Sequence, residues 1–536
     1  MNKTSGQNYK QSSKKRLGAV PALLLVLCLL LAACGGLEKN LNQVTANPKV
    51  TAAVQLSPVS IAVNNSPAAV AGAASGATST PVIAPTPTID RKYPVVPPAT
   101  PTVEVKQAPT PVVTGTFEAI DREAELQTIK AAYDAINKHL FKEPDTATLL
   151  KIGLKEEASV TGGTLPDITF SKDTEANWNI FTNNFGKILD AAGNFKYPKF
   201  QLARRIVSEM ADAIGDDHTY FMDPVSYQSR QNLLSGNNAS VGFGVVITTQ
   251  DEKAYIVRVV PGSPAEKAGI KAGDQFAEYD GKPITDKSWS MVRNAQENET
   301  HNFTLIRSSS PQPIVVKVTK AAYNLPTVEY RLINDHIGYI AIRDFFLNVA
   351  DETDKAMVEL RKQGANSWII DVRENPGGIN VEQVTGRFVA GGEIMGYNTN
   401  RQTREEMKVN NDLQNNPNKG KPFSPLLPLT LLMDNVSASS SEMLALAVKD
   451  FKLGTLIGTQ TAGALGHTVA YPLGDGSAIS VTVDEYESRG GAKVNGIGVT
   501  PDIAVDRSIE DLVAGRDPQL KTAVQYLEKV VAKKSN

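Results

Sequence analysis

Three serines followed by a glutamate, Ser439-Ser440-Ser441-Glu442, form the segment with the clearest capacity for chemistry. The segment follows the apolar run 429–433 and precedes the apolar run 443–448, which predicts a strand, a turn and a helix. A hydroxyl at such a junction lies beside unpaired amides of the helix start, which can bind a developing negative charge. Ser439 is therefore a candidate nucleophile, although Ser439 and Glu442 also have the spacing of a purely structural capping box.

A second glycine-rich turn has the composition of an anion-binding loop. The buried run 367–372 leads into Arg373-Glu374-Asn375-Pro376-Gly377-Gly378, whose glycines let backbone amides approach a ligand closely. A strand at 337–345, a helix at 352–363 and a helix at 381–389 surround it. This alternation predicts a layered α/β core.

Composition excludes several other classes of function. The net charge of −2 makes nucleic acid an unexpected partner. The two cysteines, Cys28 and Cys34, stand at the N-terminus, so no downstream disulfide or cysteine metal site is expected. The five histidines have no close metal-ligand spacing, and we predict neither a metal nor a cofactor.

The N-terminus has the pattern of a targeting segment. Basic residues precede the apolar stretch 17–31, which ends in Leu31-Ala32-Ala33-Cys34-Gly35 and resembles a bacterial lipobox. We predict a lipoprotein signal peptide at 1–33, a lipid on Cys34 and an extracytoplasmic protein anchored to a bacterial membrane. Residues 34–115 are rich in Pro, Ala and Thr and predict a disordered tether.

Two regions precede the core. Helical spacing of apolar residues predicts a helical region at 116–228, closing with a turn that contains His218. Residues 229–320 resemble a PDZ domain: Gly242-Phe243-Gly244 leads into a strand, and Pro261-Gly262-Ser263-Pro264-Ala265 opens a short helix. The resemblance implies that a peptide C-terminus binds as an added strand. The segment expected to hold it is Val241, Gly242, Phe243, Gly244 and Val245.

The ordered motifs together resemble the C-terminal processing (tail-specific) peptidases of the S41 serine peptidase family. These motifs are the two PDZ segments, Asp371 to Gly378, Ser439-Ser440-Ser441-Glu442 and Gly498-Val499-Thr500-Pro501-Asp502. The resemblance implies an α+β multidomain fold with an N-terminal helical region, an inserted PDZ-like β domain and a layered α/β, crotonase-like core at 321–536. It also implies Ser439 as nucleophile and an oxyanion hole of Gly377, Gly378 and Ser440 amides.

The chain departs from the family at the general base. The best-known members carry a lysine 25 positions after the serine, and this chain has Ala464 there. The chain is similar to the tricorn-type branch, in which the base is a histidine before the inserted module, here His218, oriented by a residue at the position of Asn495. Weaker alternatives for the base are His467, Lys449 and Lys493. Weaker alternatives for the acidic partner of the histidine are Glu485 and Glu487.

The sequence therefore predicts a lipid-anchored serine endopeptidase that acts on proteins or peptides and recognises their C-termini. The missing lysine leaves open a second function, a catalytically inactive peptide-binding scaffold. The sequence gives no oligomeric state.

Overall fold

The computed structural model describes residues 116–535, with gaps at 172, 217, 236–238, 286–291, 293–294, 412–421 and 423–425. The predicted signal peptide, Cys34 and the tether at 34–115 lie outside the described residues. No helix within the described ranges is long and apolar enough to cross a membrane.

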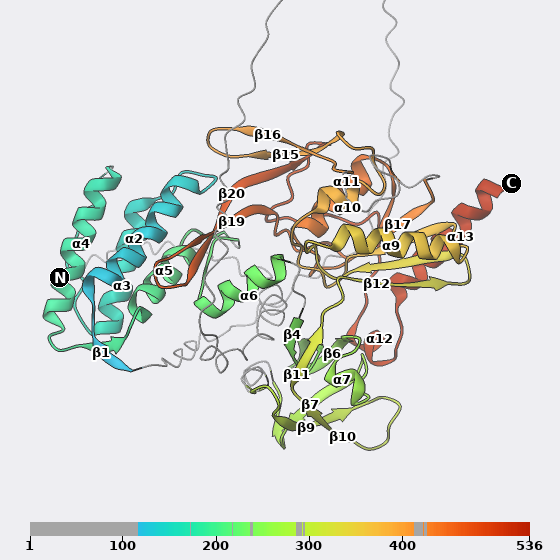
Figure 1. The fold of residues 1–536 in the computed structure, drawn as a ribbon, viewed down its shortest axis with the longest axis horizontal. Helices are drawn as coiled ribbons and strands as arrows, with labels where there is room; N and C mark the ends of the chain where they lie inside the picture. The colour runs from blue at the N-terminus through green and yellow to red at the C-terminus, as the bar shows by residue number, and fades with distance from the viewer. Residues whose placement is uncertain are drawn as a thin grey trace, which may run out of the picture. The chain divides into compact units, whose positions relative to one another are not determined.

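The first described region is a group of amphipathic helices (Figure 1). Aspartates cap four of them, because Asp121, Asp145, Asp173 and Asp223 each accept a backbone N–H of the first turn. The apolar faces of all but the last helix meet in one core that includes Ile136 and Phe181, both fully buried. The helices are α2 (Arg122–His139), α3 (Thr146–Thr161), α4 (Thr174–Ala191), α5 (Gln201–Asp212) and α6 (Pro224–Leu234), with the short strands β1 (Phe117–Ala119) and β2 (Lys196–Pro198) paired beside them.

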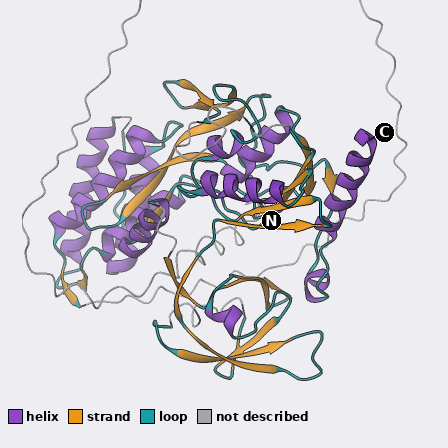
Figure 2. Cartoon of the chain, turned by 45° about the vertical axis from the view of Figure 1, so that its right-hand side comes forward, coloured by secondary structure: helices purple, strands orange, loops and turns teal. Residues whose placement is uncertain are grey.

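Where the structure describes it, the second region is mostly strands, with the short helix α7 packed among them (Figure 2). Its main sheet has the order β10-β9-β7-β6-β5, and β8 pairs with β7. A separate pair, β4 with β11, joins the chain entering the module to the chain leaving it. The elements are β4 (Ala239–Gly242), β5 (Val245–Gln250), β6 (Lys253–Val259), α7 (Pro264–Lys267), β7 (Gln275–Tyr279), β8 (Lys282–Pro283), β9 (Thr300–Ile306), β10 (Ile314–Thr319) and β11 (Ala321–Asn324).

The core is a six-stranded sheet with helices on both faces. Its order is β12-β13-β14-β17-β18-β21, and every pair is parallel except β12 with β13. Alternate residues of β13 face opposite layers, so Ile340 packs in the cluster that contains α9 and α11, and Ile337 packs in the cluster that contains α13. The elements are β12 (Val328–Ile333), β13 (Ile337–Ile342), α9 (Val349–Lys362), β14 (Ser367–Asp371), α10 (Val381–Thr385), β17 (Leu429–Met433), α11 (Ser440–Asp450), β18 (Gly454–Gly458), β21 (Ile503–Ala504), α12 (Ile509–Val513) and α13 (Pro518–Ser535).

A second, antiparallel sheet completes this region. Its order is β16-β15-β20-β19, and β3 pairs with β20. The β3 pairing matters for function, because it ties the turn after α5 to the long strand β20. These strands are β3 (Tyr220–Met222), β15 (Ile394–Thr399), β16 (Arg404–Lys408), β19 (Gly466–Pro472) and β20 (Ala478–Ser488).

The predicted fold class, helical region followed by a β module and a layered α/β core, is confirmed. Because β14 and β17 are adjacent and parallel, their C-terminal ends meet at one edge of the sheet. The glycine turn after β14 and the serine turn after β17 are therefore neighbours. The predicted helix at 381–389 is wrong at its end, because α10 stops at Thr385. The domain boundaries themselves stay predictions.

Candidate active site

Ser439 occupies a strained turn between β17 and α11. Its φ of +52° lies in the left-handed region, which serine seldom adopts. Its amide donates to the Ala464 carbonyl oxygen at 2.9 Å and to the Glu442 carboxylate at 3.0 Å. The residue is half-buried at the start of the helix. This is a suitable position for a nucleophile, because the helix-start amides lie next to its hydroxyl.

Glu442 holds this turn in place. Its carboxylate accepts four hydrogen bonds: from the Ser439 and Ala464 amides at 3.0 Å, from the Gly463 amide at 2.8 Å and from the Thr461 hydroxyl at 2.6 Å. Burial nevertheless raises the pKa of this carboxyl to about 6. The capping contact expected from the sequence is therefore part of a larger cluster that fixes the serine and segment 461–464 together.

The glycine turn packs directly against the serine. A Cβ placed on Gly377 would lie 2.6 Å from the Ser439 Cβ, and one on Gly378 would lie 2.4 Å from the Phe345 carbonyl oxygen. Both residues have positive φ, +102° and +143°. Only glycine fits these two positions.

One of the three amides predicted to form the oxyanion hole already has a hydrogen-bond partner. The Gly377 amide donates to the Asn375 side-chain oxygen at 2.8 Å and is thus engaged in this structure, so its role as an oxyanion donor stays a prediction. The amides of Gly378 and Ser440 have no hydrogen-bond partner among the described residues. The Ser440 hydroxyl donates to the Gly378 carbonyl oxygen at 2.8 Å and links the two turns.

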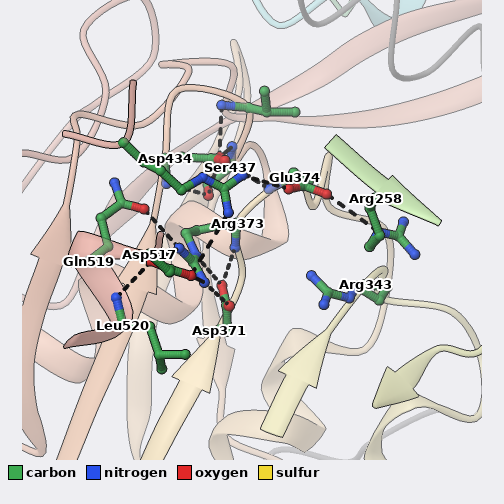
Figure 3. A network of polar contacts seen from close by, with 12 residues as sticks. Arg258, Arg343, Asp371, Arg373, Glu374, Asp434, Ser437, Asp517, Gln519 and Leu520 are labelled. Carbon is green, nitrogen blue, oxygen red and sulfur yellow. Dashed lines mark hydrogen bonds and ion pairs between the residues drawn. The ribbon is translucent and has the colours of Figure 1, made fainter. Parts of the chain in front are cut away.

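A buried polar network holds Arg373 and Glu374, the residues that lead into the glycine turn (Figure 3). Arg373 donates to both oxygens of Asp371 and also pairs with Asp517, and these bonds keep the pKa of Asp371 well below its usual range despite burial. The Asp434 carboxylate accepts the Glu374 amide at 3.1 Å. Arg258 of β6 reaches Glu374 at 3.3 Å, so the β module contacts the residue beside Asn375. The turn is thereby fixed by groups from several elements.

Ser439 lines a cavity of about 490 Å³. Its wall includes both turns, the residue expected to act as base, a further histidine and several charged groups. The residues that line it include His218, Tyr220, Arg230, Asp344, Gly377, Gly378, Glu382, Ser439, Ser440, His467 and Thr468. The structure thus brings together Ser439, His218 and the expected oxyanion residues, which are far apart in the sequence.

Hydrogen bonds to β20 position His218. Asp216 accepts from the Thr219 hydroxyl at 2.7 Å and from the Thr482 hydroxyl, and the Thr482 amide donates to Thr219 at 3.1 Å. A Cβ on Gly466, two residues beyond Ala464, would lie 3.3 Å from the His218 ring. The His218 Nε2 atom is buried and has no partner among the described residues. It therefore has no protein group competing for a proton transfer.

A second histidine in the cavity has an acidic partner that the sequence analysis missed. The His467 Nδ1 atom lies 2.7 Å from Asp484, and Asp484 accepts from Asn400 at 2.7 Å. The His467 side chain is 52% exposed. His467 and Asp484 are directly opposite each other on β19 and β20. Pairing these two strands as a hairpin in sequence would have found the dyad.

The other predicted site residues lie elsewhere. The Ala464 carbonyl oxygen accepts from the Ser439 amide at 2.9 Å, but its methyl side chain offers no base. Asn495 accepts from the Leu465 amide at 3.1 Å, does not line the cavity, and forms no hydrogen bond with His218 among the described residues. The lysines are engaged outside this cavity: Lys449 with Asp502 at 3.7 Å, and Lys493 with Glu485 at 3.1 Å and Glu487 at 4.0 Å.

The predicted peptide-binding segment runs from the end of β4 through a two-residue turn into the start of β5. Val241 and Gly242 pair with β11, while the Phe243 side chain is buried in the core of the module. The Phe243 carbonyl accepts from Ala265 at 2.8 Å, and the Gly244 carbonyl accepts from Val260 at 2.9 Å. These bonds fix the loop that leads into Val245 and the edge strand β5.

Asp344, Glu382 and Arg230 were also missed. Burial raises the pKa of Asp344 to about 8, and burial raises the pKa of Glu382 as well. No isolated signal marks these residues in the sequence, because they come from three separate elements. Among the described residues, no group of His, Cys, Asp or Glu is arranged to hold a metal ion.

Comparison with known proteins agrees with this geometry. Residues 336–505 match the family model of peptidase family S41, and residues 241–318 match that of the PDZ domain. Residues 336–505 therefore form a serine-type peptidase domain of the S41 type, and residues 241–318 form a PDZ domain.

Its relatives include a carboxy-terminal-processing protease of Bartonella bacilliformis, 27% identical over 57% of this chain and 70% of the relative. A carboxyl-terminal-processing protease of Picosynechococcus is 29% identical over 56% of this chain and 73% of the relative. A solved photosystem II D1 C-terminal processing protease matches at 22% identity with a TM-score of 0.45, over 72% of this chain and 93% of that one.

Proposed function

We propose that this protein is a lipid-anchored, extracytoplasmic endopeptidase that uses Ser439 and His218 and processes protein C-termini. The observation that carries the proposal is the shared cavity, which is lined by Ser439, His218, Gly378 and Ser440. C-terminal processing is the activity in the names of the relatives. The PDZ domain supports recognition of a peptide tail.

The first step is acylation. His218 Nε2 accepts the Ser439 hydroxyl proton as the oxygen attacks the peptide carbonyl carbon. The Gly378 and Ser440 amides donate to the resulting oxyanion, and each such donor contributes roughly 3 kcal/mol when measured by its removal. The protonated histidine then gives its proton to the leaving amine.

The second step is hydrolysis of the acyl-enzyme. His218 takes a proton from water, the hydroxide oxygen attacks the ester carbon, and the proton returns to Ser439 as the acid product leaves. An acidic partner is not required for this cycle, although its absence makes the imidazolium less stable.

His467 is the alternative base, because Asp484 orients its ring and its Nε2 atom faces away from that bond. We favour His218, since its Nε2 atom is buried without a competing partner, whereas His467 is half exposed. The two assignments make different predictions for the same two alanine variants.

The test compares full-length wild type with Ser439→Ala, His218→Ala and His467→Ala, using a fluorophosphonate probe and an unfolded protein substrate. We expect Ser439→Ala to abolish labelling and turnover while the protein stays folded, and His218→Ala to lower kcat by about 10³-fold or more. A large loss in His467→Ala with little change in His218→Ala would transfer the base to the His467–Asp484 pair. A wild type that neither labels nor cleaves would instead support the inactive scaffold.

The anchor has its own test. Cys34→Ser should abolish incorporation of radiolabelled palmitate, because serine lacks the thiol that carries the lipid. Without acyl chains the protein should leave the membrane fraction. Equal membrane association of the variant and wild type would contradict the proposed lipid.

A further inference from the structure

The cavity beside Ser439 contains an arginine with no acidic partner. Arg230, on α6, donates to the Tyr220 hydroxyl at 3.0 Å and to the Thr468 hydroxyl at 3.3 Å. Both partners are neutral, and no ion pair involves Arg230 within the described part of the chain. A guanidinium has five N–H donors, so donors remain for a ligand.

The two hydroxyl bonds fix the guanidinium on the cavity wall. Tyr220 belongs to β3 and Thr468 to β19, and both strands pair with β20. Tyr220, Arg230 and Thr468 all line the cavity that contains Ser439. Two hydroxyls of one sheet thus position the guanidinium in the cavity that Ser439 also lines.

The carboxyl groups of the same cavity do not neutralise it. Burial raises the pKa of Asp344 to about 8, so this group is mainly protonated at neutral pH. Burial also raises the pKa of Glu382. Neither carboxyl group forms an ion pair with Arg230 among the described residues, so an anionic group of a ligand is the natural complement of this guanidinium.

We infer that Arg230 binds a carboxylate of the peptide substrate inside the catalytic cavity, as a specificity site separate from the PDZ domain. The carboxylate is either the C-terminal one, close to the scissile bond, or the side chain of an Asp or Glu. Arginine suits both, since its planar fork matches the two carboxylate oxygens. This inference rests on the proposed peptidase function.

The experiment uses three matched peptides on the full-length protein: one with a free C-terminal acid, its C-terminal amide, and the amide with a Glu near the scissile bond. Each is measured with wild type, Arg230→Gln and Arg230→Lys. Wild type should favour one of the acidic peptides over the neutral amide by about tenfold to a hundredfold in kcat/KM. Arg230→Gln should remove this preference while still cleaving the neutral amide, and Arg230→Lys should retain part of it. Which acidic peptide is favoured identifies the source of the carboxylate.

Tyr220→Phe is the control for a purely structural role, because it removes a hydrogen bond of Arg230 and keeps the charge. It should preserve the preference for the acidic peptide. Equal losses for all three peptides in Arg230→Gln would mean that the arginine only ties α6 to the sheet, and would overturn the inference. A preference that survives in Arg230→Gln would also overturn it, since the PDZ domain would then be its source.

Binding of the same peptides to Ser439→Ala, with and without Arg230→Gln, is measured by fluorescence anisotropy. This arm needs no turnover. If wild type labels with fluorophosphonate but Arg230→Gln does not change acid-over-amide binding, the carboxylate site fails and the peptidase stands. If wild type does not label, the peptidase fails, and the anisotropy arm still supports or overturns the carboxylate site.

Discussion

Replacing Glu442 by glutamine tests how the nucleophile is positioned. The carboxylate takes two donors on each oxygen, the Thr461 hydroxyl and Gly463 amide on one and the Ser439 and Ala464 amides on the other. Glutamine has the same shape but only one oxygen. In the better orientation its NH₂ group faces the Thr461 hydroxyl, which can turn to accept a hydrogen bond, and the Gly463 amide, which cannot, so one hydrogen bond is lost.

The magnitude follows from those bonds. The lost bond to a charged acceptor contributes roughly 1.5–3 kcal/mol, and the two bonds that remain on the amide oxygen become weaker because their acceptor is no longer charged. Two effects reduce the loss: the charge is costly to bury, as its pKa of about 6 indicates, and the Ser439 amide keeps the Ala464 carbonyl at 2.9 Å. We expect a net loss of about 2–4 kcal/mol in the free energy of unfolding. We also expect a fall of about ten- to a hundredfold in kcat, since a small displacement of the serine disturbs the attack.

Urea unfolding and peptide cleavage measure the two effects, with Glu510→Gln as the matched control. Glu510 is an exposed glutamate in the first turn of α12 and should change stability by less than about 0.5 kcal/mol. If Glu442→Gln unfolds at the same urea concentration as Glu510→Gln and retains wild-type kcat, then the cluster does not position Ser439, and the reasoning fails.

Two further predictions concern a backbone position and a buried acid. Gly378→Ala should lower kcat by about 10²-fold or more, because its Cβ would meet the Phe345 carbonyl at 2.4 Å and displace an oxyanion donor, and steady-state kinetics with wild-type activity would contradict this. Glu157 is fully buried in α3 without a hydrogen-bond partner among the described residues, and burial raises its pKa from 4.5 to about 9. The folded state therefore binds this proton more tightly, and the associated stability, complete below pH 4.5, is lost as the pH rises toward 9. Glu157→Gln should then increase Tm relative to wild type by several degrees near pH 9 and change it little near pH 5, and a shift independent of pH would refute the cause.

The sequence by itself determined the nucleophile candidate and the order of the elements around it. The apolar run of β17, the serine turn and the apolar start of α11 are local signals, because strand, turn and helix preferences act over a few residues. The glycine pair at 377 and 378 was equally readable, since glycine is required where the backbone is left-handed and crowded. The absence of the lysine was also readable, because counting 25 positions from Ser439 reaches Ala464.

Only the tertiary structure decided which groups share the cavity with Ser439. Strand pairing places His467 opposite Asp484, and packing of α6 against β3 and β19 brings Arg230 to the same space. The bond of the Gly377 amide to Asn375 was likewise not readable from the sequence. The contacts of His467 and Arg230 join residues 10 to 238 positions apart, and local propensity contains no information about them. The order of strands in the two sheets supplies this information, because that order determines which strand ends and turns meet.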